Sequence, residues 1–189
     1  MRRCAGLALL LAATFAAPFA RPQAGAGVVR YHYGDNPAWA DPNFDDSAWP
    51  IAPNSSFPAP AYQSDGFFWV RAQVAIPAGA SDPVAIESKT IDPFPNVQEL
   101  WVNGRLVGRN GDFPAHARPL AHPRMLVFDI PPGVVRPSSV APVVLRAWDA
   151  PADNAMSLRL RHPDPVNVEF SIAGAPLLHA LSSQTQDRA

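Results

Sequence analysis

Four aspartates lie within a stretch of 12 residues near the start of the chain: Asp35, Asp41, Asp45 and Asp46. Carboxylate oxygens in loops are the ligands that calcium prefers, so this segment is a candidate calcium site. The spacing is not that of an EF-hand loop, and the glycine that such a loop requires is missing. The alternative is that Asp45, Asp46 and Ser47 cap a turn, because short polar side chains accept hydrogen bonds from nearby backbone N–H groups. Turn capping is the simpler interpretation, and calcium is the one cofactor for which the sequence offers ligands.

Large aromatic side chains are the second group that could do chemistry, because they can line a concave face and stack on sugar rings. They are Trp39, Trp49, Tyr62, Phe67, Phe68, Trp69, Trp101 and Trp148. Trp101 alternates with Leu100 and Val102, so it should point away from the face that these two residues bury. Trp148 should share a strand face with Val144 and Arg146.

The candidate ligand-binding residues are therefore Trp101, Trp148, Arg71, Tyr62 and Asn103. The alternative for Trp39, Trp49 and Trp69 is that they close the ends of a sandwich core, which is the usual use of large aromatic residues. For Trp101 the sequence leaves two possibilities open, a surface binding site and packing in a second layer.

The sequence gives only weak support for a zinc site or for a catalytic site. His116 and His122 share a loop, but no close pair of histidines or cysteines predicts a zinc site. Glycoside hydrolysis needs two carboxyl groups that flank one bond. For the three glutamates, Glu87, Glu99 and Glu169, salt bridges on strand surfaces are the simpler prediction. The sequence has no Gly-x-Ser-x-Gly elbow and no phosphate-binding loop, so we expect no enzymatic activity.

Composition restricts the fold that must position these residues. The chain has 189 residues, of which 23 are proline and 48% are apolar, and its formal net charge is −1. So many prolines argue against a helical bundle, a coiled coil or a Rossmann-type domain, because each proline removes a backbone donor. The near-neutral charge and the lack of a basic cluster argue against nucleic-acid binding.

The first 26 residues resemble a secretory signal, which predicts an exported protein in the periplasm or outside the cell. Arg2 and Arg3 precede an apolar run from Ala5 to Ala17, and Ala24-Gly25-Ala26 is a small-x-small cleavage site. An uncleaved anchor is the alternative, but the run is short for a span of about 20 residues. The single cysteine, Cys4, lies inside this leader, so the mature chain would have no disulfide.

The rest of the chain predicts one antiparallel β-sandwich or jelly roll over residues 27–173. Nine short runs are strand-like: 28–33, 67–76, 84–91, 97–103, 105–108, 124–130, 143–149, 156–161 and 166–172. Asn103-Gly104 between two of them predicts a type I′ hairpin. None of the prolines falls inside the longer runs, as central strands require. Leu177, Leu178 and Leu181 predict a short helix in a connector over residues 174–189.

Three motifs occur in an order that resembles a known family. Residues 34–49 read Gly-Asp-Asn-Pro-Ala-Trp-Ala-Asp-Pro-Asn-Phe-Asp-Asp-Ser-Ala-Trp, residues 66–71 read Gly-Phe-Phe-Trp-Val-Arg, and residues 99–108 read Glu-Leu-Trp-Val-Asn-Gly-Arg-Leu-Val-Gly. This order is similar to the galactose-binding-like jelly roll that opens family 2 glycoside hydrolases. It resembles more closely the extracytoplasmic sensor domains of bacterial membrane signalling proteins. Val70 departs from the pattern, in which tyrosine is usual.

The resemblance to sensor domains implies a non-catalytic, ligand-binding input domain, tethered to a membrane-bound output module. The ligand would be a carbohydrate or a related small molecule. The alternatives are a carbohydrate-binding accessory domain of a glycoside hydrolase system, or a sandwich used only for structure or dimerisation. No catalytic residues carry over from the hydrolases, because there they belong to a separate barrel.

Overall fold

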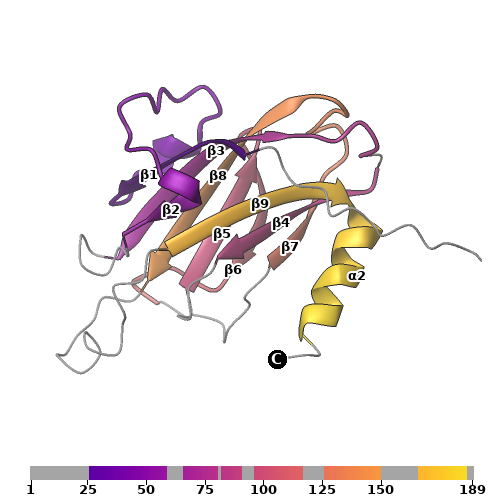
Figure 1. Ribbon diagram of the computed structural model, residues 1–189. Coiled ribbons are helices and arrows are strands. Elements are labelled where there is room, and N and C mark those ends of the chain that lie inside the picture. Colours follow the sequence, from indigo (N-terminus) through magenta and orange to yellow (C-terminus); the bar gives the residue numbers. More distant parts are fainter. Residues whose placement is uncertain are drawn as a thin grey trace, which may run out of the picture.

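The computed structural model describes residues 26–58, 66–80, 82–90, 96–116, 126–149 and 166–186. The predicted signal segment up to residue 25, Tyr62, His122 and the predicted strand 156–161 lie outside these ranges. Two antiparallel sheets pack face to face as a β-sandwich, and one helix lies against the second sheet (Figure 1). The predicted fold class is therefore confirmed.

The five-stranded sheet has the order β1 (Ala26–Tyr33), β3 (Phe67–Ala75), β8 (Val140–Asp149), β5 (Asn96–Val102), β6 (Arg105–Asn110). The four-stranded sheet has the order β2 (Ser56–Phe57), β9 (Val166–Gly174), β4 (Val84–Thr90), β7 (Leu126–Ile130). Two short 3₁₀ turns, η1 (Pro37–Ala40) and η2 (Pro53–Ser55), lie between β1 and β2.

The main core lies between the two sheets and follows the period-2 pattern of the sequence. In β3, Val70, Ala72 and Val74 point inward and are buried, as predicted. They meet inward side chains of the second sheet, among them Ile86 and Ile172. Each of these positions alternates with one on the opposite side of its sheet. The five-stranded sheet therefore has an outer face, which is formed by the residues that alternate with these core positions.

The predicted hairpin is present between β5 and β6. Asn103 has a φ of 49° and Gly104 a φ of 71°, as the two central residues of a type I′ turn require. Val102 pairs with Arg105 across the turn. A register shift follows between Leu100 and Trp101, so β6 carries one extra residue there.

One prediction about proline is wrong. Strand β8 begins at Val140 rather than at residue 143, so Pro142 lies inside it, opposite Gln73 of β3. The Pro142 carbonyl accepts a hydrogen bond from the Asn103 backbone N–H at 2.9 Å. In an extended strand the nitrogen of a residue points the same way as its carbonyl, so the Pro142 nitrogen faces the hairpin turn. There the ladder to β5 has ended at Val102, and the strand does not need the missing donor.

The short helix that the leucine spacing predicts is present as α2 (Ala175–Gln186). Leu178 packs with Ala85 and Ala173, which lie on the outer side of the four-stranded sheet. Figure 1 shows the helix (yellow) running along this sheet from the end of β9. Within the described residues, no helix combines the length and the hydropathy needed to cross a membrane.

Candidate functional site

The outer face of the five-stranded sheet holds a second apolar cluster. Trp49, Trp69 and Val144 are buried there, and Trp39, Ala40, Phe44 and Trp101 pack against them. The expectation that Trp39, Trp49 and Trp69 close the ends of the core between the sheets is therefore wrong in its location. The reason is the strand alternation, since Trp69 follows the inward-pointing Phe68 and must point outward. The aromatic-rich segment 34–49 then folds back and covers this part of the face.

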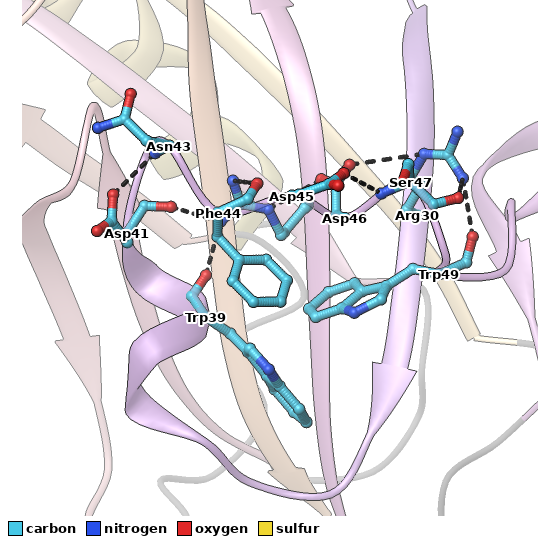
Figure 2. A network of polar contacts seen from close by, with 10 residues as sticks. Arg30, Trp39, Asp41, Asn43, Phe44, Asp45, Asp46, Ser47 and Trp49 are labelled. Atoms are coloured by element: carbon cyan, nitrogen blue, oxygen red, sulfur yellow. Dashed lines mark hydrogen bonds and ion pairs between the residues drawn. The ribbon is translucent and has the colours of Figure 1, made fainter.

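Arg71 of β3 holds this segment in place. Its side chain is only 4% exposed, and its Nε donates to Asp46 Oδ2 at 2.9 Å. Its terminal nitrogens donate to the backbone carbonyls of Trp39 at 2.6 Å, Asp41 at 3.0 Å and Phe44 at 3.4 Å. Figure 2 shows the residues that carry these acceptors, Trp39, Asp41, Phe44 and Asp46, together in this segment. Arg71 was a candidate ligand-binding residue, but the structure uses its donors to fix the segment to the sheet.

The four aspartates of the candidate calcium site do not converge. Asp41 Oδ1 accepts from the Asn43 N–H at 2.8 Å, and Asp45 Oδ1 accepts from the Ser47 N–H at 3.0 Å, so both cap turns, as predicted for Asp45. Asp46 is paired with Arg71, and Asp35 is paired with Arg146. No three of the described His, Cys, Asp and Glu side chains form a group that could hold a metal ion.

The hydrogen bonds of the Asp45 turn also change the pKa of its carboxyl group. The hydrogen bonds from the backbone and then the side chain of Ser47 lower the pKa of the Asp45 carboxyl, and the charge of Arg30 adds to this effect. A carboxylate that accepts hydrogen bonds is favoured in its ionised form. The Asp45 carboxylate is therefore engaged in its own turn.

A ladder of alternating charges crosses the outer face beside the aromatic cluster. Arg146 of β8 binds both oxygens of Asp35, at 2.7 Å and 2.5 Å, and Glu99 of β5 at 3.1 Å. Glu99 also pairs with Arg109 of β6, and Asp35 accepts from the Trp69 indole N–H at 3.2 Å. Burial would lower the pKa of Arg146, but its hydrogen bonds to Asp35 and Glu99 outweigh burial and raise it. The predicted salt bridging of Glu99 is confirmed, although its side chain is only 4% exposed.

Aromatic rings flank this ladder. Cζ of the Arg146 guanidinium lies 4.1 Å from the centroid of the Phe113 ring and 5.4 Å from that of the Phe67 ring. These two rings are stacked on each other. Trp148, two residues along β8, lies 6.5 Å from Phe67. Guanidinium groups over ring faces are attracted by the ring quadrupole, so the rings and the ladder stabilise one arrangement.

Trp101 occupies the open side of the same face. Its ring is stacked on Trp69 with the centroids 5.6 Å apart and the planes at 18°. It is only partly buried, and its neighbour on the edge strand, Leu106, is 45% exposed. Arg109, two pairs further along β6, is 53% exposed. Trp101 therefore packs in a second layer and is also partly open to solvent, which combines the two possibilities that the sequence leaves.

The structure brings together three of the five candidate ligand-binding residues. Trp101, Trp148 and Arg71 share the outer face of the five-stranded sheet. Asn103 lies in the hairpin turn, where its side-chain amide donates to the Val134 carbonyl at 2.5 Å. Tyr62 lies outside the described residues.

The charge ladder is the part of the site that sequence reasoning missed. Alternation along β5 places Glu99 on the same face as Trp101, so the glutamate could have been assigned to this face. Its partner Arg146 is 47 residues away, and Asp35 is 111 residues from Arg146. These pairs depend on strand order and register, which the local pattern does not contain.

Comparison with known proteins identifies the domain. Residues 33–148, more than half of the chain, match the family model of the beta-galactosidase second all-beta domain. This supports the resemblance to the β domains of family 2 glycoside hydrolases, while nothing supports the resemblance to sensor domains. No curated protein sequence matches the chain.

The chain is similar to parts of several solved structures, two of which are Bacteroides enzymes. A Bacteroides uniformis beta-glucuronidase 2 has 23% identity over 70% of this chain and 15% of its own, with a TM-score of 0.49. A family 2 glycosyl hydrolase from Bacteroides cellulosilyticus has 21% identity over 66% of this chain and 17% of its own, with a TM-score of 0.44. The chain thus spans a small part of the length of these enzymes. On the strength of the family match, the chain belongs to the family of the second all-β domain of beta-galactosidases.

Proposed function

We propose that the chain is an exported, non-catalytic carbohydrate-binding domain that works beside a glycoside hydrolase. The observation that carries this proposal is the match of residues 33–148 to an all-β domain of beta-galactosidases. A fold alone does not define a function, so the binding residues must be argued from the site itself.

The open side of the outer face has the chemistry that a sugar needs. The Trp101 ring is held in one orientation by its stack on Trp69, so it can receive the apolar face of a pyranose without losing side-chain entropy. Leu106 extends the apolar surface, and the exposed Arg109 beside Glu99 supplies polar groups for hydroxyls. A few fixed polar groups around an aromatic surface are typical of small-molecule sites.

The non-catalytic part of the proposal has its own support. Asp35 and Glu99 are two acidic side chains of this face, and both bind the same guanidinium, that of Arg146. Glycoside hydrolysis needs one carboxyl group as acid and a second as nucleophile or base, each facing the bond to be cleaved. Two carboxylates that are engaged by Arg146 and, for Glu99, also by Arg109 are poorly placed for these roles.

The sensory-input interpretation depends on sequence motifs alone, and neither the family match nor the geometry favours it. The family match therefore favours the accessory-domain interpretation.

Calorimetric titration with galactose and with β-linked galacto-oligosaccharides tests the proposal. We expect measurable binding, and we expect the Trp101→Ala variant to lose at least about tenfold in affinity, as a central aromatic contact does. The matched control is Leu177→Ala on helix α2, which covers the other sheet and should bind as the wild type does. Thermal unfolding of both variants verifies that the fold is intact.

Two results would contradict the proposal. Binding that is absent across a broad glycan array would remove the carbohydrate function. Reproducible hydrolysis of a β-glycoside panel by the purified chain would instead remove the non-catalytic assignment.

A further inference from the structure

A small pocket lies on the outer face of the five-stranded sheet, apart from the Trp101 surface. Its volume is about 210 Å³, and its lining includes Val28, Arg30, Asp46, Arg71, Gln73 and Pro142. It shares no residue with the open side around Trp101, Leu106 and Arg109. Drug-sized ligands occupy pockets of roughly 300–1,000 Å³, so this pocket suits one small ring rather than an oligosaccharide.

The lining carries more positive than negative charge. Arg30 and Arg71 are both cations, and Asp46 is the one anion among the lining residues. Asp46 Oδ2 accepts from Arg71 at 2.9 Å, and Asp46 Oδ1 lies 3.7 Å from Arg30 Nε. One carboxylate is therefore shared by two guanidinium groups, and the charged lining residues together carry one net positive charge.

Arg30 is the cation that has an N–H donor available for a ligand. Its Nη1 donates to the Ser47 carbonyl at 3.2 Å and to the Trp49 carbonyl at 2.8 Å, which holds the guanidinium plane in place. The second terminal nitrogen, Nη2, has no partner in the part of the chain that the structure describes, and Figure 2 shows it pointing away from the segment. The Asp45 carboxylate also interacts with the charge of Arg30, but it is exposed and accepts from the Ser47 N–H, so water screens its charge.

The remaining walls complete a site for a ring that bears an anion. The exposed side chain of Gln73 offers an amide for hydroxyl groups, and Pro142 and Val28 form an apolar wall. A planar guanidinium with free N–H groups matches a carboxylate in geometry, and such charge-assisted hydrogen bonds are about twice as strong as neutral ones.

We propose that this pocket, the Arg30 pocket, binds an acidic monosaccharide through its carboxylate. Arg30 Nη2 donates to the carboxylate, the Gln73 amide bonds to ring hydroxyls, and the ring packs on Pro142. The choice of a sugar as the carrier of the carboxylate rests on the proposed carbohydrate-binding function. The choice of a carboxylate rests on the charge of the pocket alone.

Titration with galacturonate, with galactose as the neutral counterpart, tests the inference by calorimetry and amide chemical-shift mapping. We expect galacturonate to shift the amide signals of Arg30 and Gln73, and to bind at least tenfold more tightly there than galactose. Salt at 1 M should weaken the binding, because the Debye length falls to about 3 Å. Equal affinity for the two sugars at this pocket would overturn the inference.

Variants locate the site. Arg30→Gln should lower galacturonate affinity at least tenfold, whereas Arg105→Gln, which removes an exposed arginine from β6, should leave it unchanged. Gln73 is exposed, so Gln73→Ala keeps the fold and should lower the affinity at least threefold even if Arg30→Gln loosens segment 34–49. Unchanged affinity in Gln73→Ala would overturn the assignment of the pocket.

The Trp101→Ala variant separates this inference from the proposed function. It should keep galacturonate binding while losing neutral glycan binding. If neutral glycans bind and galacturonate does not, the Arg30 pocket is wrong and the accessory function stands. If galacturonate binds and no neutral glycan does, the Trp101 surface is wrong and the Arg30 pocket stands.

Discussion

Arg71 is the residue whose loss should affect stability most, because it links segment 34–49 to the sheet. Its replacement by methionine would leave the Asp46 carboxylate and three carbonyls without their donor beneath the segment. Breaking one side of a buried ion pair costs roughly 3–5 kcal/mol. We therefore expect Arg71→Met to lower the free energy of unfolding by about 3 kcal/mol or more in a urea titration.

Arg105→Met is the matched control, since Arg105 is exposed and surface substitutions usually change stability by less than about 0.5 kcal/mol. Similar losses of unfolding free energy in the two variants would mean that Arg71 does not hold segment 34–49 on the sheet.

Tyr33 should make stability fall at alkaline pH. Its hydroxyl donates to the Pro58 carbonyl at 2.7 Å, and burial, with a contribution from Tyr31, raises its pKa from 10.0 to about 12. Between these two values the unfolded chain releases the Tyr33 proton while the folded chain keeps it, so ionisation favours unfolding. The stabilisation is complete below pH 10 and is lost as the pH rises to 12.

The Tyr33→Phe variant isolates this effect. Its stability difference from the wild type should stay constant between pH 7 and 9 and should shrink between pH 10 and 12, as measured by urea unfolding. A difference that stays constant up to pH 12 would show that Tyr33 ionises alike in both states.

At the scale of elements, the β5–β6 hairpin depends on Gly104. Its φ of 71° disfavours other residues, and a Cβ there would lie 2.6 Å from Cδ of Pro42 in segment 34–49. Gly133 has a similar φ of 81°, but a Cβ there would meet nothing within 4 Å. Gly133→Ala therefore measures the conformational cost alone, of order 1–3 kcal/mol. Gly104→Ala should destabilise by clearly more, and equal losses would mean that Pro42 does not press on the turn.

Local patterns predicted most of the elements correctly. Alternation located β3 and β9 within two residues of their ends, and Asn103-Gly104 identified the hairpin, because these signals lie within a few neighbouring residues. The start of β8 was missed, because Pro142 is tolerated only through its position beside the end of β5, a matter of tertiary pairing.

The outer layer of the site could be predicted only in part, for the same reason. Alternation correctly turned Trp101 away from the core, and side-chain chemistry correctly favoured turn capping for Asp45. The folding of segment 34–49 onto Trp69 depends on Arg71, which is 25 or more residues distant. Sequence spacing predicted the functional residue types but not which of them the strand order would bring together.

At the scale of the whole molecule, the two sheets contact each other at a seam between the edge strands β6 and β7. β6 is an edge of the five-stranded sheet, and β7 is an edge of the four-stranded sheet. Gly108 of β6 lies against the ring of Phe128 of β7, and a Cβ at Gly108 would overlap the ring atoms Cγ, Cδ1 and Cε1. The absence of a side chain at residue 108 thus allows the sheets to close on this side.

A double-mutant cycle between these two positions tests the seam. Gly108→Ala alone should lower the free energy of unfolding by at least about 1–3 kcal/mol, the usual cost of overpacking. In a Phe128→Ala background the ring is gone, and the same substitution should cost less than about 0.5 kcal/mol, because alanine is otherwise no worse than glycine in a strand. The coupling energy should therefore exceed about 1 kcal/mol in urea titrations of the four proteins. Additive losses would mean that Gly108 is needed for its backbone conformation in β6 and that the contact between the sheets is not the constraint.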